Sequence, residues 1–105
     1  MTRNKFSGQL YDLIIKAENG DPKDVDFIMQ NLNSESTFAM TRYIDFSLGL
    51  VTNEMGIARI EHYLFNGSQI QRNYSSLFFN RRGDWEIVKK AFHLGLIDEI
   101  QAFAR

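Results

Sequence analysis

The side chains best suited to binding chemistry in this chain are basic, and they gather where one predicted helix ends and the next begins. They lie around the single tryptophan and comprise Arg72, Arg81, Arg82, Trp85, Lys89 and Lys90. Guanidinium and ammonium groups bind phosphates and carboxylates, and an exposed tryptophan can anchor a protein partner. We therefore take these residues as the candidate binding residues, for a nucleic acid or for an acidic protein.

A structural role for the same residues is the competing interpretation. Arg81 and Arg82 fall in the last turn of a predicted helix, where cations offset the negative end of the helix dipole. Arg72 and Arg81 lie about 180° apart around a helix of 3.6 residues per turn, so they do not share a face. Trp85 begins the next helix, from where we expect it to cover the core. The balanced charge of the chain favours this structural interpretation.

The other titratable and nucleophilic residues fail the spacing tests for metal or catalytic sites. His62 has no second histidine one turn further on, and His93 falls at a helix end. The acidic residues within 21–26 are interrupted by Pro22 and lack the glutamate that closes a calcium loop. Ser75 has no flanking Gly-x-Ser-x-Gly motif. The sequence therefore predicts a protein that is not an enzyme, with no catalytic residue, metal or cofactor.

The composition is that of an ordinary globular protein. The 105 residues are 44% hydrophobic and 24% charged, and their formal net charge is −1, which gives no strong field for polyanions. The chain has no cysteine, so disulfides and thiolate sites are excluded and a reducing compartment fits. No apolar run has the length of a signal-peptide core or a membrane span. We expect a single helical domain, residues 1–105, in the cytoplasm, with no membrane partner.

Hydrophobic periodicity predicts an all-α fold of six or seven short antiparallel helices, because no stretch sustains the alternation of a strand. The expected helices are residues 5–18, residues 22–32, a third from Ser34 or Ser36 to Leu48, a fourth from Thr52 or Asn53 to Phe65, a fifth from Ser68 to Gly83, a sixth from Trp85 to Leu94, and a last from Ile97 or Asp98 onward.

Turn chemistry supports these boundaries. Asp21 suits an N-cap with Pro22 at the first helical position, and Gly83 suits a left-handed C-terminal cap. Asp84 suits the N-cap of the next helix. Gly56 lies in the first turns of its helix, where a glycine either weakens the helix or lets another backbone approach.

Apolar spacing also predicts which side chains are buried. The third helix has a broad apolar face, expected to be covered by neighbouring helices: Met40, Ile44 and Leu48, with Ala39, Tyr43 and Phe46 beside them. The last helix is expected to use Ile100 and Phe103. Tyr63, Phe65 and Phe79 fall outside the main apolar stripes, and aromatic residues in such positions are typical of a double-sided helix or an interface.

Two segments of the chain repeat the same pattern of helix, glycine turn and helix. A shift of 63 places Gly20-Asp21 on Gly83-Asp84, and a shift of 46 places residues 46–51 on residues 92–97. This pattern resembles the α-α hairpin arrays of HEAT-like and tetratricopeptide-like repeat proteins, although no constant period runs through the chain. The resemblance implies a superhelical stack of helices whose exposed face binds another macromolecule, and a compact bundle fits the same pattern.

Two functions follow as expectations. The first is a small helical protein–protein interaction or scaffold module, without catalytic activity of its own, whose partner is another protein or a second copy of the chain. The alternative is a nucleic-acid-binding helical domain that uses the basic cluster on the fifth and sixth helices. The two differ in one measurable property, because binding through phosphates weakens steeply as salt rises.

Overall fold

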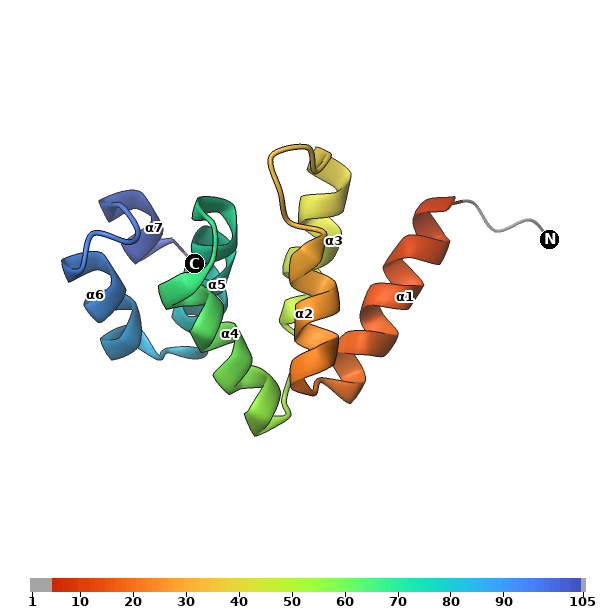
Figure 1. The fold of residues 1–105 in the computed structure, drawn as a ribbon, viewed down its shortest axis with the longest axis horizontal. Coiled ribbons are helices and arrows are strands. Elements are labelled where there is room, and N and C mark those ends of the chain that lie inside the picture. The colour runs from red at the N-terminus through yellow and green to blue at the C-terminus, as the bar shows by residue number, and fades with distance from the viewer. Residues whose placement is uncertain (1–4, 105) are drawn as a thin grey trace. The chain divides into compact units, whose positions relative to one another are not determined.

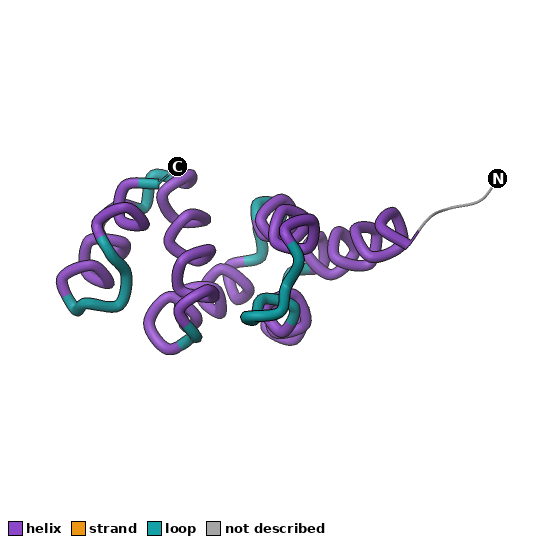
Figure 2. The backbone as a smooth tube through the Cα atoms, turned by 90° about the horizontal axis from the view of Figure 1, so that it is seen from above, coloured by secondary structure: helices purple, strands orange, loops and turns teal. Residues whose placement is uncertain are grey.

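The computed structural model describes residues 5–104, and the side chains of residues 8–104. Within this range the chain forms helices and loops without a strand, which confirms the all-α prediction (Figures 1 and 2). The helices are α1 (Lys5–Asn19), α2 (Pro22–Gln30), α3 (Phe38–Leu48), α4 (Glu54–Asn66), α5 (Gln69–Arg82), α6 (Trp85–His93) and α7 (Glu99–Phe103). Every predicted helix is present, with ends displaced by a few residues at most.

Side-chain caps begin several of the helices. The Asp21 and Ser68 side chains each accept a hydrogen bond from the backbone N–H three residues on, and the Asp24 and Gln71 side chains each accept one from the backbone N–H of the cap residue. These reciprocal pairs satisfy backbone N–H groups that a helix leaves without partners. Thr37 caps α3 by accepting from the Met40 N–H at 3.0 Å, so the prediction of a serine cap there is wrong. The nearest serine, Ser36, instead donates to the Asn31 carbonyl.

Glycines in the left-handed region end three helices or turns. Gly20, Gly83 and Gly95 have φ values of 67°, 83° and 78°. The glycines of the two Gly-Asp turns in the 63-residue repeat thus share a left-handed φ, but the aspartates differ, with ψ 174° at Asp21 and 60° at Asp84. Gly49, the counterpart of Gly95 in the 46-residue repeat, has φ −62° and ends α3 in the right-handed region. That second pair therefore has similar residues but different backbone geometry.

The chain divides into two compact units, one up to Arg59 and one from Ile60 onward, with the division inside α4. In the N-terminal unit α1, α2 and α3 pack against one another (red to yellow in Figure 1). Its buried apolar side chains are Leu13, Ala17, Val25, Ile28, Met29, Leu32, Ile44, Leu48 and Val51. The prediction of a single domain is not tested by this division and stays a prediction.

The first turns of α4 contact the turn between α1 and α2. A Cβ atom built on Gly56 would lie 1.9 Å from the Gly20 carbonyl oxygen, so only glycine permits this approach. Further along α4, the Arg59 guanidinium pairs with the Asp26 carboxylate at 2.7 Å. Gly56 is therefore the close-approach glycine that the sequence offered as one of two interpretations.

In the C-terminal unit α5, α6 and α7 pack against one another. The buried apolar side chains of this unit are Ile60, Leu64, Phe78, Phe79, Val88, Ala91, Ile97 and Ala102. The face that α5 buries also contains polar side chains, Ser75, Ser76 and Asn80. The Asn80 amide donates to the backbone oxygens of Gln101 and Ala102, at 3.3 and 3.0 Å, and so ties α5 to α7.

Several predictions of burial are wrong. Trp85 is 51% exposed rather than buried, and Phe46 is 56% exposed. In α7 the inward residue is the small Ala102, whereas Ile100 and Phe103 are 75% and 64% exposed. The cause is the same in α3, α6 and α7, since each of these helices carries more large apolar side chains than the neighbouring helices cover.

Candidate functional site

The basic cluster lies at the end of α5 and in the middle of α6, and its exposed members have local contacts. Arg82 pairs with Asp84 at 2.9 Å, and its guanidinium lies over the Phe78 ring, 5.6 Å from the centroid. This ion pair occupies the Asp84 carboxylate, which makes no capping hydrogen bond to α6. Asp84 is nevertheless the N-cap residue of α6, as the sequence predicts. Arg81 is exposed beside Arg82 in the last turn.

The lysines of α6 are exposed on the same helix. Lys89 lies 4.0 Å from the Glu86 carboxylate, and the Lys90 ammonium lies over the Phe65 ring at 5.6 Å from the centroid. Contacts of this kind at an exposed surface contribute little to stability and leave the cations accessible to water. The cluster keeps its positive charge, but part of that charge is offset by neighbouring carboxylates.

Arg72 differs from the other basic residues, because its hydrogen bonds connect separate parts of the fold. Its Nε donates to the Leu96 carbonyl at 2.7 Å, one terminal nitrogen donates to the Gly67 carbonyl at 2.8 Å, and the other donates to Gln69. The guanidinium thus joins the start of α5 to the loop after α6. All three of its nitrogens are occupied, as expected for a structural arginine rather than for one that binds a phosphate.

Trp85 combines an exposed ring with an anchored nitrogen. Its Nε1 donates to the Asn80 carbonyl at 3.3 Å, which fixes the indole against the end of α5. An indole held in this way loses little freedom when it meets a partner. Of the sequence-predicted site residues, Trp85 therefore retains the geometry of a binding residue.

The acidic residues at the start of α2 have structural partners. Asp24 is buried and accepts hydrogen bonds from Asn19 and from the Asp21 backbone, with Lys16 at 4.0 Å. Burial raises the pKa of Asp24. The hydrogen bonds from Asn19 and Asp21 and the charge of Lys16 lower it, and together they outweigh the effect of burial, so the pKa of Asp24 is below its ordinary value. Asp21 and Asp24 therefore cap the helix, which confirms the N-cap predicted for Asp21, whereas Asp26 pairs with Arg59.

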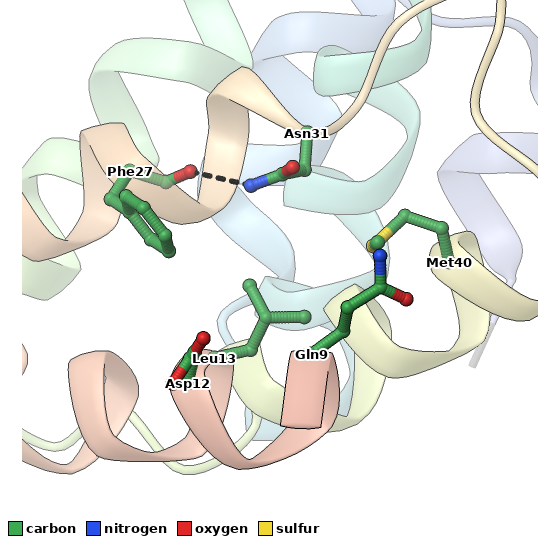
Figure 3. A pocket seen from close by; sticks show the side chains of 6 residues that line it. All are labelled: Gln9, Asp12, Leu13, Phe27, Asn31 and Met40. Atoms are coloured by element: carbon green, nitrogen blue, oxygen red, sulfur yellow. Dashed lines mark hydrogen bonds between the residues drawn. The ribbon is translucent and has the colours of Figure 1, made fainter. Parts of the chain in front are cut away.

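A small pocket of about 90 Å³ lies among α1, α2 and α3 (Figure 3). It is lined by Gln9, Asp12, Leu13, Phe27, Asn31 and Met40. The Asn31 amide, at one side of the pocket, donates to the Phe27 carbonyl at 2.9 Å. Asp12 is the only titratable side chain in the lining, so the pocket brings no acid–base pair together.

A larger groove lies between α1 and α3 and is predominantly apolar. Its volume is about 430 Å³, and it is lined by Leu10, Phe38, Ala39, Arg42, Tyr43 and Phe46. We call this feature the α1–α3 groove. Phe38 is 76% exposed and Phe46 is 56% exposed, so both rings meet water in the isolated chain. Exposed aromatic rings beside a concave surface are typical of a binding site.

The sequence of α3 explains why these rings point outward. Residues 38, 42 and 46 fall at successive fourth positions on one face of the helix. The opposite face buries Thr41, Ile44, Ser47 and Leu48. Thr41 and Ser47 tolerate burial because each hydroxyl donates to a carbonyl of its own helix, at 2.7 Å in both cases. Two hydroxyl residues thus take interior positions, while two phenylalanines remain at the surface.

Arg42 places one positive charge within the apolar groove. Its guanidinium carbon lies 5.7 Å from the centroid of the Phe38 ring, a distance suited to a cation–π interaction. The groove can therefore bind an apolar side chain and, at the same position, a carboxylate. Among residues 8–104, the side chains that line the groove include neither a histidine nor a carboxylate that could act as a general base.

The groove residues were absent from the sequence-predicted binding set. Phe46 was assigned to the margin of the buried face, and Phe38 and Arg42 were not assigned. The signal that could have identified them is the second stripe at 38, 42 and 46, opposite the stripe through Ile44 and Leu48. Of the off-stripe aromatics expected at an interface, Phe79 is buried, and Tyr63 and Phe65 are half-buried.

No helix in residues 5–104 combines the length and the apolar character that crossing a membrane requires. In the same part of the chain, no three metal-ligating side chains converge. No protein-family model matches the chain, and neither a curated protein nor a solved structure matches it.

Proposed function

We propose that this chain is a helical protein–protein interaction module, without catalytic activity of its own, whose docking surface is the α1–α3 groove. The observation that carries the proposal is the exposure of Phe38 and Phe46 beside a concave apolar surface of about 430 Å³. Burying a phenylalanine side chain is worth about 1.5–3 kcal/mol, so a partner that covers both rings gains substantial free energy. Aromatic side chains are also enriched among the residues that dominate interface energetics.

The shape and spacing of the groove favour a helical segment as the bound element. Its aromatic residues are eight positions apart on one helix, which corresponds to about two turns. An amphipathic helix lying in a groove between two helices presents apolar residues with a similar repeat. Arg42, midway between the two rings, favours a partner that has a carboxylate near its apolar residues.

The alternative is a nucleic-acid-binding function through Arg81, Arg82, Lys89 and Lys90. The exposure of these residues and their position on two neighbouring helices support this alternative. The Arg82–Asp84 ion pair and the structural contacts of Arg72 reduce the charge available to phosphates. The groove therefore supports the interaction module more strongly than the cluster supports nucleic-acid binding.

Two further features belong to this proposal. We place the protein in the cytoplasm, which the absence of cysteine supports. The two Gly-Asp turns, whose glycines share a left-handed backbone, support an arrangement of helical hairpins like that of HEAT-like repeats. In repeat proteins of that kind, exposed helix faces are the usual binding surfaces.

The test is affinity capture from a lysate of the organism that makes the protein, with and without nuclease. Wild type is compared with the double variant Phe38→Ser/Phe46→Ser. Met55→Ser is the matched control, because Met55 is 67% exposed in the same unit but does not line the groove. Thermal melts of all three proteins establish that they are equally folded, as expected for substitutions of exposed residues.

The proposal expects one or a few proteins at stoichiometric level that survive nuclease and bind Met55→Ser as they bind wild type. The double variant should lose them. Equal capture by the double variant would show that the groove is not the docking surface. Capture that disappears with nuclease, and that falls steeply with salt, would replace the proposal with the nucleic-acid alternative.

A further inference from the structure

We infer that one occupant of the α1–α3 groove is a second copy of this chain, which inserts Ile100 and Phe103 of its α7. This inference rests on the proposed function, because it assigns a partner to the same groove. It joins two exposed features of one sequence, an apolar groove with a positive charge and an apolar helix with a negative charge. The contact is head-to-tail, because the two surfaces that meet are different.

The inserting element is the exposed face of α7. Ile100 is 75% exposed and Phe103 is 64% exposed, and residues three apart lie on one face of a helix. The opposite side of α7 faces the unit, where Ala102 is buried and the Asn80 amide holds the backbone oxygens of Gln101 and Ala102. This short helix is therefore anchored by its backbone while its two largest apolar side chains are presented to solvent.

The receiving surface matches this element in size and in character. A volume of about 430 Å³ lies in the range of pockets that hold small ligands, enough for a few apolar side chains. Leu10, Ala39 and Tyr43 provide its interior wall, and Phe38 and Phe46 lie at the exposed side of α3. An inserted Ile100 and Phe103 would cover the two exposed rings and be covered in turn.

Charge complementarity favours α7 as the inserting element. Asp98 and Glu99 begin this helix and both are exposed, and residues 98–105 contain these two acids and one basic residue, Arg105. Arg42 provides the opposite charge within the groove. Trp85 is also exposed in this unit, but its flanking acids Asp84 and Glu86 are each within ion-pair distance of a basic side chain, Arg82 at 2.9 Å and Lys89 at 4.0 Å. Docking of Trp85 would therefore bring paired acids and additional lysines towards Arg42, which disfavours it.

A head-to-tail contact makes a prediction that a symmetric contact does not. The groove variant Phe38→Ser/Phe46→Ser keeps α7 but cannot receive it. The α7 variant Ile100→Ser/Phe103→Ser keeps the groove but has nothing to insert. Each variant alone should be monomeric, whereas an equimolar mixture should form a 1:1 complex through one intact groove and one intact α7.

The experiment is sedimentation equilibrium of the full chain from about 10 μM to about 1 mM, the range in which weak complexes dissociate. The inference predicts that the mean mass of wild type rises with concentration and that each variant associates at least about tenfold more weakly. The mixture should regain a heterodimer. Met55→Ser serves as a control for loss of an exposed apolar residue elsewhere and should associate like wild type.

A charge exchange tests the same contact without removing apolar residues. Arg42→Glu alone and Glu99→Arg alone should each weaken association, and the chain with both substitutions should regain it because the pair is reversed. Wild type that stays monomeric throughout the concentration range, or a mixture of the two double variants that stays monomeric, would overturn the inference. If lysate capture still depends on Phe38 and Phe46 in that case, the proposed function stands with a different partner.

Discussion

The contact between Gly56 and Gly20 makes the sharpest prediction about stability. In Gly56→Ala, the new Cβ would lie 1.9 Å from the Gly20 carbonyl oxygen, 3.0 Å from the Gly20 carbonyl carbon and 3.1 Å from Val51 Cγ1. The nearest atoms belong to backbone, which cannot rotate away as a side-chain end can. The start of α4 must therefore separate from the α1–α2 turn by about 1 Å before the contact becomes tolerable.

The expected cost is the difference between two opposed effects. Overpacking of a closely packed site typically costs about 1–3 kcal/mol, and a clash with backbone lies at the upper end of that range. Alanine in place of glycine within a helix regains about 1 kcal/mol through helix propensity. The net expectation is a loss of about 2 kcal/mol, which corresponds to a fall in melting temperature of about 8–16 °C for a chain of this size.

The assay is thermal and urea unfolding followed by circular dichroism at the helical band, with Gly8→Ala as the matched control. Gly8 also lies within a helix, but a Cβ there would meet no atom within 4 Å. Gly8→Ala should leave stability unchanged or raise it by up to about 1 kcal/mol. A Gly56→Ala protein that melts at or above the wild-type temperature would refute the packing of α4 against the α1–α2 turn.

Three further predictions concern buried polar groups. Asn80→Ala should destabilise by about 1–3 kcal/mol, because it removes both hydrogen bonds to the end of α7, and faster amide exchange in residues 99–103 should accompany the loss. Ser75→Ala should be neutral or stabilising by up to about 1 kcal/mol in urea unfolding, because the buried Ser75 hydroxyl has no hydrogen-bond partner among the described residues; a clear loss of stability would contradict that reading. Asp24, whose folded pKa is lowered, stabilises the fold above its ordinary value of 3.8, and this contribution is lost as the pH falls below that value through the folded pKa. The stability difference between wild type and Asp24→Asn should therefore be largest near neutral pH and shrink below pH 3.8, as urea titrations at several pH values would show.

The helices and most of their ends were predictable because their signals are local. Asp21 with Pro22 starts α2, Ser68 starts α5, and the left-handed Gly83 ends it, each through chemistry within a few residues. The start of α3 shows the limit of such signals. Ser36 was as good a cap candidate as Thr37, but its hydroxyl is taken by the Asn31 carbonyl at the end of the preceding helix.

Burial was less predictable, because it depends on which neighbours are present. The apolar pattern of α3 and α7 marks more residues as suitable for burial than the adjacent helices can cover, and Phe46 and Ile100 are left exposed. Conversely, Asn80 is buried because tertiary placement gives its amide partners in α7 that no local pattern indicates, whereas the buried Ser47 hydroxyl donates within its own helix. The groove could not be predicted for the same reason. Its aromatic residues are recognised as exposed only once it is known which face of each helix its neighbours cover.

The most direct test of the docking surface is photo-crosslinking in living cells, with benzoylphenylalanine in place of Phe46. The same group in place of Met55, which is exposed outside the groove, is the control. If the α1–α3 groove docks a protein, position 46 will yield a discrete protein adduct that position 55 does not, and a second Arg42→Glu substitution will weaken it. If position 46 yields no protein adduct, or the same adducts as position 55, the groove is not a protein-docking surface.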